Sequence, residues 1–182
     1  MRSLVLFAAA AAGIGASAMS TPSFGQTANV SEQCVRTKTS FDLTVHASYD
    51  ETAPLFGPEG ERPWAGKHWD PQFIYPRPAR DEEGAVFTVQ HGPVSAVWVN
   101  TVFDVEGRHF QYAYFIAGLM VTTIDVRFNP VDVANTQVHV VYTRTAPAPE
   151  GNEHVTAMTE GDHRAGKEWQ EAIDTYLANR KR

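Results

Sequence analysis

Segments in which hydrophobic and polar residues alternate dominate the chain between residues 36 and 146. In residues 37–47, Phe41, Leu43 and Val45 take every second position, with polar residues between them. This period of two predicts a β-strand with one buried face. Similar patterns predict strands over residues 85–91, 94–105, 108–118, 120–131 and 136–146, and a short extended segment over residues 73–75. We therefore expect seven strands, with tight turns at residues 91–93 and 106–107.

Helical spacing replaces the alternation near the end of the chain. From about residue 153 onward the apolar positions predict one long helix, with a single apolar face formed by Ala165, Trp169, Ile173, Tyr176 and Leu177. Gly161 and Gly166 each weaken this helix by about 1 kcal/mol relative to Ala, so we expect a bend or a close approach there. A short helical piece is also expected just after residue 48. Because an antiparallel meander cannot bury one face alone, the long helix should cover the sheet, which gives an α+β fold.

The first 25 residues have the layout of a secretory signal peptide. Arg2 precedes an apolar run from residue 4 to residue 12, and small residues follow. Cleavage fits after Ala18 or after Gly25, and the polar residues 20–25 favour the second position. The apolar run is shorter than the roughly 20 residues of a spanning helix, so we expect no stable membrane anchor. We therefore predict a signal peptide (1–25), a polar lead-in (26–35) and one domain (36–182) in an exported protein, periplasmic or secreted.

Charge and cysteine content narrow the function classes. The chain has a formal net charge of −6, and loss of Arg2 with the signal peptide makes it more negative still. An acidic domain without clustered Lys and Arg is a poor binder of nucleic acid, so we expect none. Cys34 is the one cysteine, which excludes an intramolecular disulfide, and we interpret it as a free thiol. The hydrophobic core must therefore supply the stability.

The segment "GPEGERPWAGKHWDPQFIYP" (57–76) is too rich in Pro and Gly for a regular element. One interpretation makes Glu61, His68 and Asp70 an acid–base or metal-binding group. The other is structural: Trp64 and Trp69 cover one end of the core, and the Glu61 carboxylate accepts hydrogen bonds from backbone N–H groups of the loop. We favour the structural interpretation, which predicts that Glu61→Ala lowers stability and leaves any chemistry untouched.

The order of elements resembles that of the START/SRPBCC superfamily. Its members have the helix-grip fold, a seven-stranded antiparallel sheet curled around a long C-terminal helix. Locally, "LFGPEGERPW" (55–64), "WDP" (69–71), "GAVF" (84–87) and "WVN" (98–100) resemble segments of bacterial SRPBCC-type proteins. The resemblance implies a hydrophobic ligand pocket between sheet and helix. Known members bind lipids, sterols, polyketides or hormones, and some are cyclases or hydratases, so the resemblance implies no particular reaction.

Aromatic residues on the apolar phase of the strands and helix are the expected pocket lining. We predict that Trp98, Tyr112, Tyr114, Tyr142 and Trp169 contact the ligand, and that Glu61, Trp64 and Trp69 lie at the pocket mouth. Gly161, Ala165 and Gly166 are expected to leave room beside the helix. Tyr hydroxyls would orient a ligand that carries one polar group.

The chain lacks the common catalytic motifs. It contains no G-x-S-x-G, no phosphate loop and no histidines at HxH or HxxxH spacing. Glu160 and His163 are one helical turn apart, and we interpret them as part of a solvated helix face. We therefore expect no metal, and we expect no cofactor. The sequence thus favours an exported binding protein for a hydrophobic or amphipathic, lipid-like small molecule. Two alternatives remain: a cyclase- or hydratase-type enzyme with a pocket Tyr or carboxylate as acid–base group, and a ligand-free interaction domain.

Overall fold

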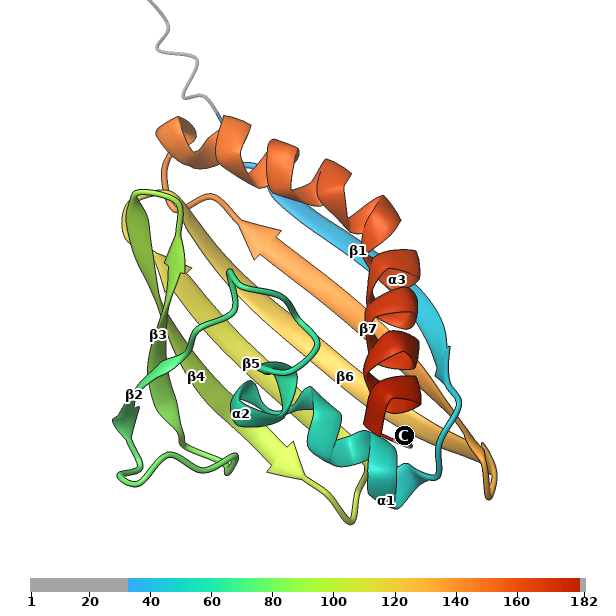
Figure 1. Cartoon of the computed structure of the whole chain (residues 1–182). Helices are drawn as coiled ribbons and strands as arrows, with labels where there is room; N and C mark the ends of the chain where they lie inside the picture. Colours follow the sequence, from blue (N-terminus) through green and yellow to red (C-terminus); the bar gives the residue numbers. More distant parts are fainter. Residues whose placement is uncertain (1–32, 181–182) are drawn as a thin grey trace, which may run out of the picture. The chain divides into compact units, whose positions relative to one another are not determined.

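Seven antiparallel strands form one sheet in the computed structural model, which describes residues 33–180 (Figure 1). The strands are β1 (Arg36–Val45), β2 (Gln72–Tyr75), β3 (Val86–His91), β4 (Val94–Asp104), β5 (His109–Ile116), β6 (Met120–Asp132) and β7 (Asn135–Thr145). Their order across the sheet is β1-β7-β6-β5-β4-β3-β2, so β2 to β7 form a meander and β1 returns beside β7. The predicted seven-stranded antiparallel sheet is confirmed, and each predicted strand boundary lies within two residues of the observed one.

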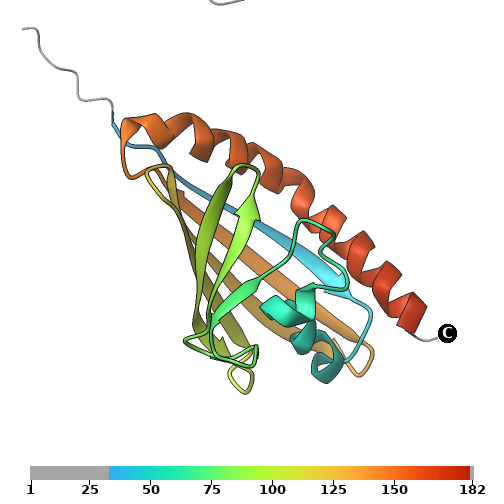
Figure 2. The same cartoon turned by 60° about the vertical axis from the view of Figure 1, so that its left-hand side comes forward.

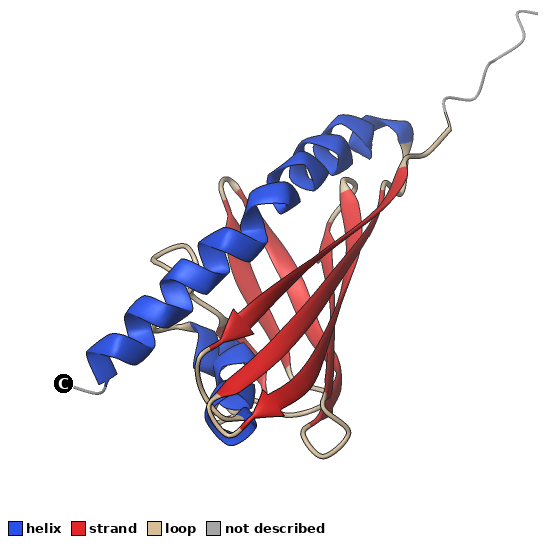
Figure 3. Ribbon diagram, turned by 90° about the vertical axis from the view of Figure 1, so that its right-hand side faces the viewer, coloured by secondary structure: helices blue, strands red, loops and turns tan. Residues whose placement is uncertain are grey.

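The helices all lie on one side of the curled sheet (Figure 2). After β1 the chain forms α1 (Tyr49–Thr52), the 3₁₀ helix η1 (Ala53–Phe56) and α2 (Pro58–Glu61). A 3₁₀ turn, η2 (Pro149–Gly151), leads into the long α3 (Asn152–Arg180). Figure 3 shows α3 running along the open side of the sheet, which confirms the predicted C-terminal helix.

Close packing of α3 against β1 explains one of the helical glycines. A Cβ atom on Gly166 would lie 3.1 Å from the ring of Phe41, so the missing side chain lets the helix approach the strand. Gly166 does not line the cavity that lies between the sheet, α3 and the loop after α2. The expectation that it makes room for a ligand is therefore wrong. The helix also curves along its length (Figure 1), as expected for a helix that wraps around a core.

Buried side chains fill the space between the sheet and the α1–α2 segment. Phe56 of η1 contacts Phe128 of β6 edge to face, with ring centroids 5.2 Å apart, and Phe128 contacts Phe110 of β5 at 5.0 Å. Ile173 and Leu177 add the apolar face of α3 to this core. This end of the sheet is thus a packed core, which leaves the remaining concave surface for a cavity.

A buried ion pair fastens α3 to the sheet. The guanidinium of Arg144 on β7 binds the Asp162 carboxylate on α3 through both terminal nitrogens, one of them at 2.9 Å. The two side chains are 3% and 8% exposed. The hydroxyl of Thr39 on β1 also donates to Asp162. The pair therefore links β1, β7 and α3 at one place.

The helix also reaches the outer edge of β1. The side-chain amide oxygen of Gln170 accepts the Thr44 backbone N–H at 2.7 Å. The amide oxygen of Asn152 accepts the Val35 N–H, also at 2.7 Å. Backbone donors of this edge strand thus bond to helix side chains instead of a neighbouring strand.

Candidate functional site

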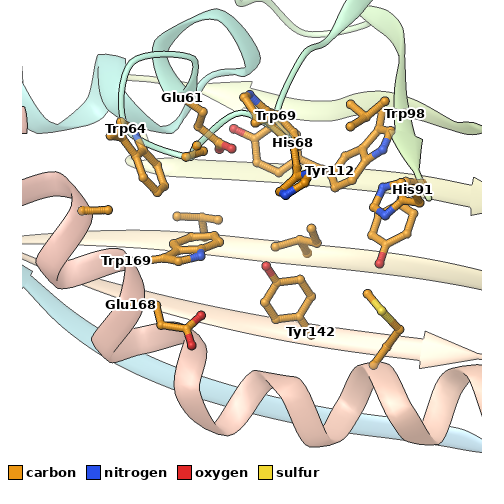
Figure 4. A pocket seen from close by; sticks show the side chains of 18 of the residues that line it. Glu61, Trp64, His68, Trp69, His91, Trp98, Tyr112, Tyr142, Glu168 and Trp169 are labelled. Carbon is orange, nitrogen blue, oxygen red and sulfur yellow. The ribbon is translucent and has the colours of Figure 1, made fainter.

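A cavity of about 490 Å³ lies between the sheet, α3 and the loop that follows α2 (Figure 4). The sheet supplies Val89, Gln90, His91, Trp98, Tyr112, Tyr114, Ile124, Val126, Tyr142 and Arg144. The last residue of α2 supplies Glu61, and the loop after it supplies Trp64, Ala65, Gly66, His68 and Trp69. Helix α3 supplies Met158, Glu168, Trp169 and Ala172. Its walls are mainly aromatic and aliphatic, with a small number of polar groups. This composition is typical of a small-molecule site.

Strand register aligns the aromatic lining into rows across the sheet. Tyr112 of β5 pairs with Ile124 of β6, which pairs with Tyr142 of β7. One row further along, Trp98 of β4 pairs with Tyr114 of β5. Because paired residues point to the same face of a sheet, these side chains meet on the concave side.

Hydrogen bonds from side chains hold the loop that roofs the cavity. The indole N–H groups of Trp64 and Trp69 donate to the carbonyls of Leu55 at 2.7 Å and Pro58 at 2.9 Å. Arg62 adds an ion pair with Asp70 at 2.7 Å. A loop without a strand ladder must satisfy its backbone groups in this way. The two indoles are therefore fixed in place beside the cavity (Figure 4).

Asp81 has the structural role that the sequence analysis assigned to Glu61. Its two carboxylate oxygens accept the backbone N–H groups of Glu59 at 2.8 Å and Gly60 at 3.1 Å. Burial raises the pKa of Asp81, and these two hydrogen bonds oppose the rise. The expectation that Glu61 anchors the loop backbone is therefore wrong. No pattern in the sequence connects Asp81 to a loop 21 residues upstream.

Glu61 instead points its carboxyl group into the cavity (Figure 4). Its side chain is partly exposed and lines this cavity, and none of the hydrogen bonds among residues 33–180 involves the carboxyl group. Burial raises the pKa of Glu61 well above its ordinary value, and the negative charge of Asp81 raises it further. The cavity therefore contains an acid whose protonated form is favoured.

The tyrosines differ in whether their hydroxyls are free. The Tyr112 hydroxyl donates to the carbonyl of Phe56, so it ties η1 to the sheet and is not free to donate to a ligand. No hydrogen bond within the described part of the chain uses the Tyr142 hydroxyl, which points into the cavity (Figure 4). Burial raises the pKa of both phenols, so both stay protonated near neutral pH.

Stacked rings close the end of the cavity near the β3–β4 turn. Trp98 stacks on Tyr114 with centroids 4.2 Å apart, and His91 stacks beside Tyr114 at 5.6 Å. Burial lowers the pKa of His91, and the nearby His154 lowers it further. The indole nitrogen of Trp98 and Nε2 of both histidines are buried without a hydrogen-bond partner in the described structure.

The structure places all eight site residues predicted from the sequence on the cavity wall. These are Trp98, Tyr112, Tyr114, Tyr142, Trp169, Glu61, Trp64 and Trp69. The alternative group of Glu61, His68 and Asp70 is not assembled, because Asp70 pairs with Arg62 outside the lining. The Arg144–Asp162 pair could not be predicted from the sequence. Only its burial distinguishes it from surface charges, and burial is not visible at sequence positions 144 and 162.

The described residues include no helix that is both long and apolar enough to cross a membrane. The predicted signal peptide and most of the lead-in lie outside residues 33–180. Cys34 is exposed, and its interpretation as a free thiol stays a prediction.

The chain resembles known proteins in its three-dimensional structure only. No family model matches the sequence. No curated protein matches it either. Norcoclaurine synthase from Thalictrum flavum, solved with dopamine and hydroxybenzaldehyde, is similar with a TM-score of 0.58 and 14% identity, over 80% of this chain and 88% of that one.

Two further solved structures show the same arrangement. Ara h 8.0201 is similar with a TM-score of 0.57 and 12% identity, over 80% of this chain and 99% of its own. CalU16 from Micromonospora echinospora is similar with a TM-score of 0.53 and 12% identity, over 81% of this chain and 88% of that one. At these identities the likeness establishes the fold. The chain thus has the helix-grip fold, and the resemblance to the START/SRPBCC superfamily is confirmed at the level of the fold.

Proposed function

We propose that this chain is an exported binding protein for a hydrophobic or amphipathic small molecule, lipid-like in its apolar part, that lies between the sheet and α3. The observation that carries the proposal is the cavity of about 490 Å³, whose aromatic walls surround a small number of unpaired polar groups. Small-molecule pockets commonly have 300–1,000 Å³ and this mixture of apolar wall and few polar groups. The export component is supported by the signal-like residues 1–25.

Apolar burial supplies the affinity in this mechanism, at about 25 cal/mol per Å² of apolar surface removed from water. The indoles of Trp64, Trp98 and Trp169 offer large, rigid surfaces that lose little conformational freedom on binding. The Tyr142 hydroxyl and the Glu61 carboxyl would orient the polar end of the ligand. No cofactor is needed.

A matched pair of variants tests the location of the site. Ile124→Trp adds an indole on the cavity floor between Tyr112 and Tyr142, whereas Thr123→Trp adds the same group on the exposed outer face. Titration with N-phenyl-1-naphthylamine, an uncharged fluorescent probe, should show binding to the wild type and to Thr123→Trp and at least tenfold weaker binding to Ile124→Trp. Equal affinity of the two variants would refute the location.

Native mass spectrometry and organic extraction of the protein purified from the periplasm would identify the natural ligand class. The same sample tests export, because the intact mass of the chain shows whether cleavage occurs after Ala18, after Gly25 or not at all. An uncleaved chain that remains in the cytoplasm would refute export.

A second candidate function is general acid–base catalysis on a bound substrate. The supporting observation is Glu61, a cavity-facing acid whose pKa burial raises toward the operating range of a general acid. This candidate predicts that compounds in a cyclisation or hydration screen are turned over and that Glu61→Gln abolishes turnover without loss of binding. Binding without turnover in such a screen favours the carrier.

A further inference from the structure

Glu61 is a partly buried acid of the cavity wall for which the described protein supplies no counter-ion. The influences on its pKa are burial and the charge of Asp81, and both disfavour ionisation. Among the residues that line the cavity, Arg144 is the sole Lys or Arg, and its guanidinium binds Asp162. The Arg144 Nε–H is buried without a hydrogen-bond partner, but the charge of Arg144 is balanced by Asp162. An anionic ligand would therefore meet a cation that is already paired, whereas a cationic ligand would meet an acid that lacks a partner.

Aromatic rings surround this acid. Trp64 of the loop and Trp169 of α3 meet edge to face with centroids 5.5 Å apart. Tyr112 and Tyr142 line the same cavity as Glu61, and a charge on Glu61 raises the pKa of both phenols. Figure 4 shows all four rings around the same space as Glu61. Ring faces of Trp and Tyr attract ammonium groups, and the attraction is stronger when water is excluded.

We propose that the ligand is an amphipathic amine, whose apolar body fills the cavity and whose ammonium group contacts Glu61 among these rings. This inference rests on the proposed binding function and adds the chemical class of the ligand. The net charge of −6 also favours the approach of cations over anions.

Binding of an amine has a consequence that can be measured in solution. Burial favours protonated Glu61 in the empty cavity. An ammonium group beside the carboxyl favours its ionised form, so the carboxyl proton leaves for the solvent when the ligand enters. Other titratable or charged groups surround this space. They are Asp81 behind the loop, Tyr112, Tyr114, Tyr142, His91 and Arg144 of the sheet, and exposed His68 and Glu168 at the rim. A neutral ligand of the same shape leaves Glu61 protonated and releases no proton.

Three probes that differ only in their end group test the proposal: 4-phenylbutylamine, 4-phenylbutan-1-ol and 4-phenylbutanoate. Each is used to displace N-phenyl-1-naphthylamine from the wild-type protein at pH 7. We expect the amine to bind at least about tenfold more tightly than the alcohol, which is 1.4 kcal/mol, and the carboxylate to bind most weakly. Calorimetry in two buffers of different ionisation heat should show up to one proton released with the amine and none with the alcohol.

Two variants assign the preference to Glu61. Glu61→Gln keeps the side-chain shape and should remove both the amine preference and the proton release, so that the amine and the alcohol bind this variant with similar affinity. Glu171→Gln removes an equal charge from the exposed side of α3, where the side chain is 68% exposed, and should retain both effects. Preference retained in Glu61→Gln would overturn the assignment.

The wild-type data alone distinguish failure of the amine class from failure of the binding function. If the alcohol or the carboxylate binds as tightly as the amine, the amine class is wrong and the binding function stands. If neither the naphthylamine nor any phenylbutyl probe binds, the binding function itself is wrong.

Discussion

Replacing Arg144 with Met would show how strongly the buried ion pair holds α3 over the cavity. The substitution keeps most of the side-chain volume but leaves the Asp162 carboxylate, 8% exposed, with the Thr39 hydroxyl as its remaining donor. Removing one partner of a buried pair costs about 3–5 kcal/mol, because the other charge stays desolvated. Domains are commonly stable by about 5–15 kcal/mol, so the loss is a large fraction of the total. At about 2–4 °C per kcal/mol, the melting temperature should fall by roughly 6–20 °C.

Urea unfolding followed by tryptophan fluorescence and circular dichroism measures this loss, with an unchanged m-value as the sign that the transition remains two-state. Arg127→Met is the control, because Arg127 pairs with Asp125 on the surface and is 58% exposed, so the change should cost less than about 1 kcal/mol. The double variant Arg144→Met/Asp162→Leu removes both charges and should recover most of the stability. A loss below about 1 kcal/mol in Arg144→Met alone would refute the reasoning.

Three further predictions concern Glu61, Gly60 and Gly161. Because burial raises the folded-state pKa of Glu61, its ionisation destabilises the fold as pH rises through that pKa, so Glu61→Gln should match the wild type near pH 4 and melt at higher temperature toward pH 9. A difference between the two that is the same at every pH would count against a titrating Glu61. Gly60→Ala should lose roughly 1–3 kcal/mol, since the added Cβ would overlap the Pro54 carbonyl oxygen. Gly161→Ala, which meets no atom within 4 Å, should gain up to about 1 kcal/mol in the same urea assay, and a loss there would contradict the open position.

The features that could be predicted from the sequence are those in which buried positions recur at a regular spacing along the chain. Alternation in residues 37–47 reflects β1, whose Leu43 and Val45 are buried while Asp42 and Thr44 are exposed. The same alternation of buried and exposed positions identified the lining residues Trp98, Tyr112, Tyr114 and Tyr142. Inward-facing side chains on neighbouring strands lie on the same concave face of the sheet.

Contacts between distant segments could not be predicted in this way. Whether Glu61 or Asp81 holds the loop depends on which carboxylate the folded backbone brings to the N–H groups of Glu59 and Gly60. The position of Gly166 depends on the rotation of α3 about its own axis, which sets the glycine against Phe41 and away from the cavity. Both outcomes follow from tertiary packing, which leaves no regular spacing of residues in the sequence.

The hydrogen bonds from α3 to β1 also bear on aggregation. β1 and β2 are the two edges of the sheet, and an unpaired edge is a template to which a strand of another molecule can add. At β1, Gln170 and Asn152 occupy the N–H groups of Thr44 and Val35. At the other edge, β2 has four residues and is followed directly by Pro76, which has no N–H. A chain truncated before α3 would therefore lose the wall of its cavity and at the same time expose an edge strand ready to pair with its neighbours.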